Sequence, residues 1–462
     1  MGLAALLIIV IVVGSWLAFF VGVGVAIYRH AQRRGRRIIL SGLGVTLLLI
    51  VSLVALNVSI QPSTPPMRHS PSDAILLARV YDSQGHASLA GISARDGSVR
   101  WRSGLAASFA AQAPISDGVA YLTSSPGAAS ATGATIVAMR LNDGAQLWRR
   151  FLPGESINST LVVRGDALLY ISHSQAGGFR VNALDLASHT PRWSSPLSHI
   201  VQVNVYPGFT YRAFAASGDL LFVGLDDGEV SALRLRDGSL AWSRAPLPTA
   251  MPQPSGLALG ANQLYVYADD GQIAALRPAD GAQLWLRPPG LTPYLPAPDY
   301  LMATNSSVYV CVNLTAANGD ESWALAALDP ATGDIRWERA GTCVVGGGLR
   351  ALTNAIESAG ILYLPGSTLT AIRVSDGATL WTASVQAYDL GFTSMVVDSG
   401  VVFAAATVVF PHEYTTCANW WSGGPLFCHS PAYIAAYDAA TGARYWSADP
   451  GDVPLFVSEV TP

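Results

Sequence analysis

The chain has 462 residues, of which half are hydrophobic and 13% are charged. Its 27 basic residues are all arginines, so chemistry that depends on a lysine Schiff base or a lysine general base is excluded. Residues 1–60 hold five arginines and no acid, and the remainder carries 22 arginines against 31 acids, a balance of −9. A mildly acidic body lacks the basic footprint of a nucleic-acid-binding protein, so no nucleic-acid partner is expected.

Two long apolar runs open the chain. Leu3–Tyr28 and Ile38–Ile60 contain no charge, and each is long enough to cross a hydrocarbon core of about 30 Å. The arginine-rich loop between them, residues 29–37, is expected in the cytoplasm. Residues 1–60 are therefore predicted to form two transmembrane helices, which place the N-terminus and everything after residue 60 outside the cytoplasm of a two-pass cell-membrane protein. Cleavage near Asn57, close to the end of the second run, is the alternative.

Residues 61–72 are rich in proline and serine and are predicted to be an extended linker. Beyond them a pattern recurs eight times: a small residue lies ten positions before a tryptophan, and in seven copies a glycine lies four positions before it. The tryptophans are Trp101, Trp148, Trp193, Trp242, Trp285, Trp337, Trp381 and Trp446. The small residues are Gly91, Ala138, Ala183, Ala232, Ala275, Ala327, Ala371 and Ala436. The third copy has His189 in place of the glycine.

Each repeat has the same internal order. An apolar run rich in β-branched and aromatic residues predicts a buried strand, and a second strand ends at the small residue. An Asp-Gly or Thr-Gly turn then leads into the tryptophan strand, because glycine readily adopts the backbone of a tight hairpin. A strand from the following segment is expected to complete a four-stranded antiparallel blade.

Repeats of about 45 residues are typical of propeller blades. The predicted fold is all-β, an eight-bladed β-propeller over residues 73–462. Pro454–Val460 has no later repeat to join, so it is expected to complete the first blade and close the ring. The tryptophans are expected to pack blade against blade, a structural role rather than substrate stacking.

The copies Asp329–Trp337 and Asp438–Trp446 resemble the tryptophan-docking repeat of quinoprotein alcohol dehydrogenases. The same repeat occurs in the propeller lipoprotein of the outer-membrane β-barrel assembly machinery, which this chain resembles in its minimal repeats. The resemblance covers residues 73–462 and implies a PQQ-like propeller. This chain departs from the family at the aspartate four positions before the glycine. Three copies keep it (Asp185, Asp329, Asp438), and four have arginine instead (Arg140, Arg234, Arg277, Arg373).

The resemblance leaves two functions open. Soluble quinoprotein dehydrogenases cap their cofactor with a disulfide between adjacent cysteines, and they carry long insertions that build a pocket and a Ca²⁺ site. Here no two cysteines are adjacent and nearly every repeat is minimal. We therefore assign no catalytic, cofactor-binding or metal-binding residue and expect no cofactor. PQQ and Ca²⁺ belong to the alternative, a PQQ-dependent dehydrogenase of alcohols or sugars that donates electrons to membrane quinone.

Four cysteines, Cys311, Cys343, Cys417 and Cys428, lie in the predicted extracytoplasmic part and suit two disulfides. Of the three possible pairings, Cys417–Cys428 with Cys311–Cys343 is favoured, since the first pair closes a local loop. A metal site that combines Cys417 and Cys428 with His412 and His429 is the weaker alternative, because the spacing matches no zinc pattern.

The one large insertion, Phe410–Pro431, holds Trp420, Trp421 and Phe427 between the last two cysteines. Aromatic side chains in a disulfide-closed loop are typical of a recognition surface, and these three are the candidate partner-binding residues. A lid that packs over the propeller is the alternative. The expected function is a membrane-anchored, non-catalytic binding or scaffold module for a protein or cell-envelope partner. A ligand sensor that acts through the two helices is a third reading.

Overall fold

The structure is a computed structural model. It describes residues 68–81, 87–103, 113–124, 133–157, 159, 161–174, 176–197, 214–225, 228–247, 254–268, 272–287, 301–315, 321–340, 352, 354–384, 390–408, 433–448 and 457–461. These residues belong to one compact unit, Met67–Pro462. They include no helix long and apolar enough to cross a membrane, and residues 1–60, where both spans are predicted, lie outside them.

The described residues form eight antiparallel sheets, one for each tryptophan repeat. Blade 1 contains β1 (Ile75–Tyr81), β2 (Ala87–Ser93), β3 (Val99–Ser103) and β33 (Val457–Thr461). Blade 2 contains β4 (Ile115–Ser116), β5 (Val119–Ser124), β6 (Gly133–Arg140) and β7 (Gln146–Pro153). Blade 3 contains β8 (Glu155–Ile157), β9 (Val162–Arg164), β10 (Ala167–Ser174), β11 (Gly178–Asp185) and β12 (Pro191–Pro196). Blade 4 contains β13 (Phe214–Ser217), β14 (Leu220–Gly224), β15 (Val230–Arg234) and β16 (Leu240–Arg244).

The second half of the chain repeats this plan. Blade 5 contains β17 (Pro254–Gly260), β18 (Gln263–Ala268), β19 (Ile273–Leu276) and β20 (Gln283–Arg287). Blade 6 contains β21 (Leu301–Ala303), β22 (Val308–Thr315), β23 (Glu321–Leu328) and β24 (Ile335–Ala340). Blade 7 contains β25 (Ile356–Ser358), β26 (Ile361–Leu364), β27 (Thr368–Arg373) and β28 (Thr379–Ser384). Blade 8 contains β29 (Leu390–Asp398), β30 (Val401–Val408), β31 (Tyr433–Asp438) and β32 (Arg444–Ala448).

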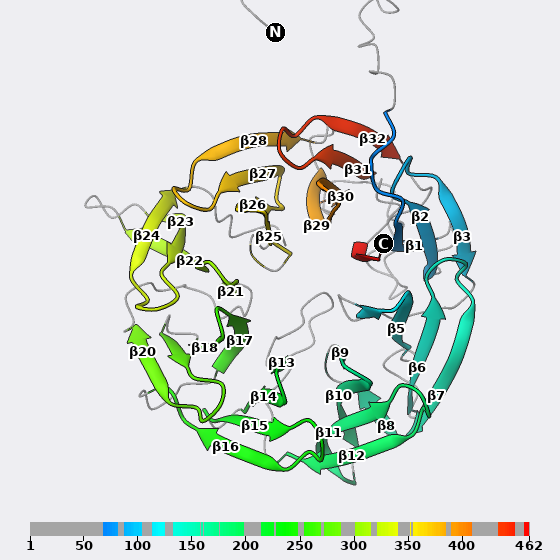
Figure 1. Cartoon of the computed structure of the whole chain (residues 1–462), viewed down its shortest axis with the longest axis vertical. Coiled ribbons are helices and arrows are strands. Elements are labelled where there is room, and N and C mark those ends of the chain that lie inside the picture. Colours follow the sequence, from blue (N-terminus) through cyan, green and yellow to red (C-terminus); the bar gives the residue numbers. More distant parts are fainter. Residues whose placement is uncertain are drawn as a thin grey trace, which may run out of the picture. The chain divides into compact units, whose positions relative to one another are not determined.

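Buried side chains join every blade to the next, and the succession returns to its start. One apolar cluster packs Leu77 of blade 1 against Val137 of blade 2, and further clusters connect each later pair of neighbours. The last cluster packs Phe403 of blade 8 against Ile92 of blade 1. Figure 1 shows the same order of strands around a common centre. The predicted eight-bladed, all-β propeller is confirmed.

The C-terminal strand completes the first blade. β33 pairs antiparallel with β1, with Leu77 opposite Ser458 and Ala78 opposite Val457. The first blade is thus built from both ends of the described chain, which joins the ring into a closed circle. Closure removes the two free blade faces that an open row of blades would expose.

The origin of the fourth strand differs from the sequence-based prediction. The sequence predicts that the strand after each tryptophan completes the blade of that tryptophan. In the structure that strand instead pairs with the next apolar run along the chain and so begins the next blade. β17 pairs with β18, for example, across the two-residue turn Ala261–Asn262. Both turn residues have positive φ, 48° and 61°, which is the backbone of the tightest hairpins. So short a turn pairs β17 with β18, and both strands belong to blade 5. The strand that follows the tryptophan of blade 4 therefore belongs to the next blade along the chain.

The small residue of each repeat lies directly between two large side chains. In blade 5, Ala275 is the cross-strand partner of both Tyr265 on β18 and Trp285 on β20. The two aromatic rings meet across it with their centroids 5.8 Å apart. Blades 2, 4, 6, 7 and 8 repeat this row with Tyr or Phe in the first position. A larger residue at this position would keep the rings apart.

Candidate functional site

The repeated tryptophans form the joints between blades. We call the five residues that end at the glycine of each repeat, such as Asp329–Gly333, the docking turn. Seven indole Nε1 groups each donate a hydrogen bond to the carbonyl three residues before that glycine, in the docking turn of the next blade. The pairs are Trp101 to Leu141, Trp193 to Leu235, Trp242 to Pro278, Trp285 to Pro330, Trp337 to Val374, Trp381 to Ala439 and Trp446 to Ala94, at 2.7–3.0 Å.

Two features of the docking turn, its backbone conformation and its contact with the neighbouring indole, require glycine at the last position. Gly333 has φ +76°, and a Cβ atom there would lie 2.9 Å from the ring of Trp285. Gly442 has φ +71°, and its Cβ would lie 2.6 Å from the ring of Trp381. Any L side chain would therefore meet both backbone strain and the preceding blade's indole.

Blade 3 solves the same problem with His189. Its φ is +57°, and its imidazole packs on the indole of Trp148 with the ring centroids 4.7 Å apart. The backbone carbonyl of His189 accepts a hydrogen bond from Arg150 Nη1 at 2.9 Å. The exception in the repeat is therefore still a docking turn, with an aromatic contact in place of the bare glycine backbone.

A second side chain, which was not predicted from the sequence, strengthens four joints. The residue two positions after the tryptophan donates to the backbone carbonyl of the next turn's glycine or of His189. The donors are Arg150, Ser195, Arg287 and Arg339, at 2.5–2.9 Å. The fixed spacing of these residues from each tryptophan is the signal that could have revealed them.

Seven of the eight docking turns use two charge layouts, and the turn of blade 1 opens with Ser93 instead. Where aspartate opens the turn, as in Asp329 and Asp438, its carboxylate accepts backbone N–H groups of the turn, and a serine or threonine precedes the final position. Where arginine opens it, as in Arg140, the aspartate moves to the position before the glycine, and Asp143 accepts from Ala145 N and pairs with Arg140 at 2.8 Å. The replacement of the family's aspartate by arginine is therefore compensated within the same turn.

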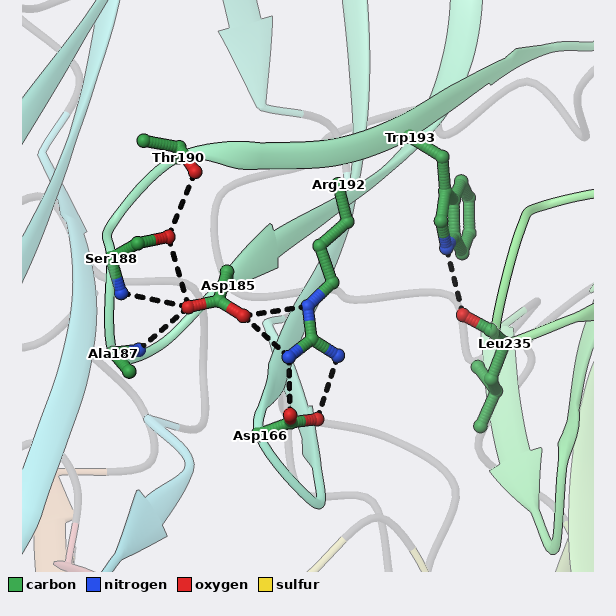
Figure 2. Close-up of polar contacts among 8 residues, drawn as sticks. All are labelled: Asp166, Asp185, Ala187, Ser188, Thr190, Arg192, Trp193 and Leu235. Carbon is green, nitrogen blue, oxygen red and sulfur yellow. Dashed lines mark hydrogen bonds and ion pairs between the residues drawn. The ribbon is translucent and has the colours of Figure 1, made fainter.

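Blade 3 has the most extended polar cluster of these turns (Figure 2). Asp185 accepts from the backbone N–H groups of Ala187 and Ser188, and Arg192 Nε donates to its other oxygen at 2.8 Å. Arg192 Nη1 donates to Asp166 at 2.6 Å. Figure 2 also shows Trp193, the next residue, with its indole turned to Leu235 of blade 4. The cluster thus orients the strand that carries the docking tryptophan.

Hydrogen bonds from the turns stabilise the charged form of these carboxylates. The hydroxyl and backbone N–H of Ser98 lower the pKa of Asp96 to about 2. The backbone N–H of Ser188, followed by Arg192, lowers the pKa of Asp185, and Arg192 also lowers that of Asp166. Hydrogen bonds have the same effect on the pKa values of Asp143, Asp237, Asp280, Asp329, Asp376 and Asp438.

These shifts predict acid-sensitive joints. A carboxyl group with a lowered pKa in the folded state contributes stability above its unfolded pKa of about 4, and that stability is lost as pH falls toward about 2. The guanidinium midpoint of the full chain in detergent should change little between pH 7 and 5 and fall between about pH 4 and 2. Combined Asp96→Asn and Asp329→Asn substitutions should flatten that fall. A midpoint that stays constant down to about pH 2 would contradict the assignment.

Six of the seven predicted disulfide and partner-binding residues lie outside the described residues. These are Trp420, Trp421, Phe427, Cys343, Cys417 and Cys428. Cys311 lies on β22, is 5% exposed and is disulfide-bonded. Its partner is not among the described residues, so the predicted pairing stays a prediction. Within the described part of the chain, no three or more His, Cys, Asp and Glu side chains gather where they could hold a metal ion.

The outermost strands of the blades, β3, β7, β12, β16, β20, β24, β28 and β32, carry ten arginines and one acid, Glu338, in a body whose balance is negative. Exposed large apolar side chains also gather on them. They are Val99, Leu147, Phe151, Leu240, Leu284 and Ile335, at 37–57% exposure. The outer edge of the ring is therefore chemically distinct from the rest of its surface.

Known proteins share this architecture. Quinohemoprotein alcohol dehydrogenase from Comamonas testosteroni is similar in structure, with 12% identity, a TM-score of 0.50, and 72% of this chain and 69% of that chain covered. BamB from Moraxella catarrhalis has 16% identity, a TM-score of 0.49, and coverage of 75% and 92%. The computationally designed protein Ika8 has 15% identity, a TM-score of 0.49, and coverage of 76% and 91%. At such identities, structural likeness concerns the fold alone.

No curated protein matches the sequence. A family model described as outer membrane protein assembly factor BamB matches residues 110–244, 177–347 and 244–448. The matched segments contain the last seven tryptophan repeats, so the resemblance carried by those repeats is confirmed. Because they cover well over half of its residues, the chain belongs to the family described as outer membrane protein assembly factor BamB.

Proposed function

We propose that this protein is a membrane-anchored, extracytoplasmic propeller that acts as a non-catalytic scaffold for a protein or cell-envelope partner. The observation that carries the proposal is how the repeated residues are used. Seven indole N–H groups are bonded to backbone carbonyls of neighbouring blades, so the recurring motif holds the ring together. Recognition is left to what differs between blades. The family's description as an assembly factor supports a protein partner.

The anchor is the two predicted helices within residues 1–60. An alkaline phosphatase domain fused after Pro462 should be active, because that enzyme requires an extracytoplasmic location for its disulfides. The chain should also remain in the membrane pellet after carbonate extraction. An inactive fusion or release by carbonate would contradict the proposed topology.

The partner site is proposed in the insertion Phe410–Pro431. Photo-crosslinking from Phe427 in native membranes should give a discrete adduct, and Trp420→Ser with Trp421→Ser should abolish it without lowering the melting temperature. Leu240→Ser with Leu284→Ser is the matched control, since it removes two exposed apolar side chains from β16 and β20. Equal loss of the adduct in both double variants would argue against the insertion as the site.

A PQQ-dependent dehydrogenase is the second candidate, because the ring resembles the fold of the Comamonas testosteroni quinohemoprotein alcohol dehydrogenase. The purified full chain should show neither saturable PQQ binding in the presence of Ca²⁺ nor dye reduction with alcohols or sugars. Saturable binding together with dye reduction would refute the scaffold proposal and support the enzyme.

A further inference from the structure

We infer that β7, the outer strand of blade 2, accepts an extended segment of a partner protein as an additional strand. The segment carries an acidic residue opposite Arg149 and apolar residues two positions away on either side of that acid. The inference goes beyond the proposed function, because it adds a second contact surface to the insertion Phe410–Pro431 and stands without it. It rests on the length of β7, on the side chains that β7 exposes and on their charge.

The length of β7 distinguishes it from the other outer strands. β7 has eight residues, whereas the other seven outer strands have five or six. Within the described residues β7 pairs only with β6, and Figure 1 shows it on the outer edge of the ring. Alternate backbone N–H and C=O groups of such an edge strand point away from the sheet and can pair with another chain. Propellers keep most of these edges short. β7 therefore offers a longer backbone ladder than any other outer strand.

The far end of β7 is held in place by its neighbours. Leu152 is 6% exposed and packs with Leu168 and Tyr170 of blade 3. Gly133 on β6 lies opposite Pro153, and a Cβ atom at Gly133 would clash with Leu152 O, so the two strands approach closely here. The backbone of β7 is thus already extended along its whole length, which lowers the entropy that is lost when a partner strand binds.

The side chains of β7 divide between the two faces of the strand. Trp148 packs on His189 and Arg150 donates to the His189 carbonyl, so this face belongs to the joint with blade 3. Arg149 and Phe151 alternate with them and lie on the opposite face, where Phe151 is 53% exposed. Phe151 is the only aromatic residue among the exposed large apolar side chains of the described chain. An added strand would cover this ring with a cross-strand partner.

Charge decides what kind of strand fits beside β7. Arg149 is exposed, and within the part of the chain that the structure describes no carboxylate pairs with it. An acidic residue opposite Arg149 would form a cross-strand ion pair, and apolar residues at the next alternate positions would meet Phe151 and Leu147, which is 41% exposed. A second copy of this chain fits less well, because two antiparallel β7 strands would bring Arg149 and Arg150 of both copies together. The occupant is therefore an acidic segment of another protein.

The test measures hydrogen–deuterium exchange of the purified full chain in detergent with a synthetic peptide. The peptide Thr-Val-Thr-Glu-Thr-Val-Thr, capped at both ends, places its valines and glutamate on one face and reads the same in both directions. At up to millimolar concentration it should slow the exchange of the β7 amides several-fold and leave the amides of β16 and β20 unchanged, because an added strand bonds to the backbone of β7 alone. The same peptide with lysine in place of glutamate should have no effect, because it would place like charges opposite each other.

Arg149→Glu should reverse this preference, so that the lysine peptide slows the exchange of β7 and the glutamate peptide does not. Arg244→Glu on β16 is the matched control, since it changes the net charge equally and should leave the preference for the glutamate peptide intact. Leu147→Thr with Phe151→Thr keeps Arg149 and the strand propensity of β7. This double variant should weaken the effect of the glutamate peptide several-fold, because the apolar cross-strand contacts are lost.

Four outcomes would overturn the inference. Equal protection of β7 by both peptides would remove the role of Arg149, and no protection by either would show that β7 does not accept another strand. Equal protection of β3, β16 and β20 would remove the distinction of blade 2. Protection of β7 that grows with protein concentration in the absence of peptide would assign this edge to a second copy instead. The photo-crosslink from Phe427 does not enter any of these measurements, so failure here leaves the scaffold proposal intact.

Discussion

Deletion of residues 457–462 is expected to lower the free energy of unfolding of the whole ring by about 3–5 kcal/mol and to make the protein aggregate. β33 contributes the backbone ladder to β1, and each such hydrogen bond contributes about 1 kcal/mol net. It also contacts β29 of blade 8 and β4 of blade 2, so one strand connects three blades. Its loss would expose the edge of β1, which can then pair with another chain.

Chemical denaturation of the full chain and the deletion variant in the same detergent measures this effect. A synthetic peptide of residues 453–462 should restore the midpoint when it is added to the variant, because it can occupy the vacated place beside β1. Removal of Pro462 alone is the control and should leave the midpoint unchanged. A deletion variant that unfolds together with the full chain would show that the ring is held closed by side-chain packing alone.

Trp446→Ala is expected to lower the free energy of unfolding by about 3–5 kcal/mol, the range for truncation of a fully buried tryptophan. Trp446 is 1% exposed, donates to Ala94 O at 2.9 Å and packs on Phe403 with the ring centroids 6.0 Å apart. It lies at the joint between blade 8 and blade 1, where the ring closes. Trp446→Phe should lower the free energy of unfolding by less, because phenylalanine keeps an aromatic face against the docking turn and only the hydrogen bond of the indole N–H is lost.

Leu240→Ala is the control, since Leu240 is 57% exposed on β16 and its truncation should change stability by no more than about 0.5 kcal/mol. Guanidinium denaturation of the three variants ranks them. If Trp446→Ala were as mild as Leu240→Ala, the tryptophan joints would not hold the ring together. If Trp446→Phe were as severe as Trp446→Ala, the hydrogen bond rather than the ring packing would be the main contribution.

The number of blades could be predicted because it depends on side chains that recur. A tryptophan and a small residue at a fixed spacing identify two adjacent strands, and Ala275 and Trp285 are indeed cross-strand partners. The pairing of the fourth strand was predicted wrongly, because it depends on the hairpin turns that precede each apolar run. Ala261 has a positive φ of 48°, which nothing in an alanine indicates.

The joints were harder to predict than the blades. The acceptor for each indole is a backbone carbonyl, and the residues that supply it include Leu141, Pro278 and Val374, which share no side-chain chemistry. Arg150 and Arg339 could not be distinguished from other surface arginines until the neighbouring blade was in place.

The paired charge layouts of the docking turns limit how a repeat can change over generations. A turn of the Asp329 kind and a turn of the Arg140 kind each place one carboxylate where the turn's N–H groups can donate to it. A single substitution on the path between the layouts yields a turn with two carboxylates or with none. Conversion of one layout into the other by single substitutions therefore passes through a weakened joint. Copying a whole repeat avoids this step, because it exchanges the first residue of the turn and the residue before the glycine together. Duplication of intact repeats offers the easier route for such a ring to diversify.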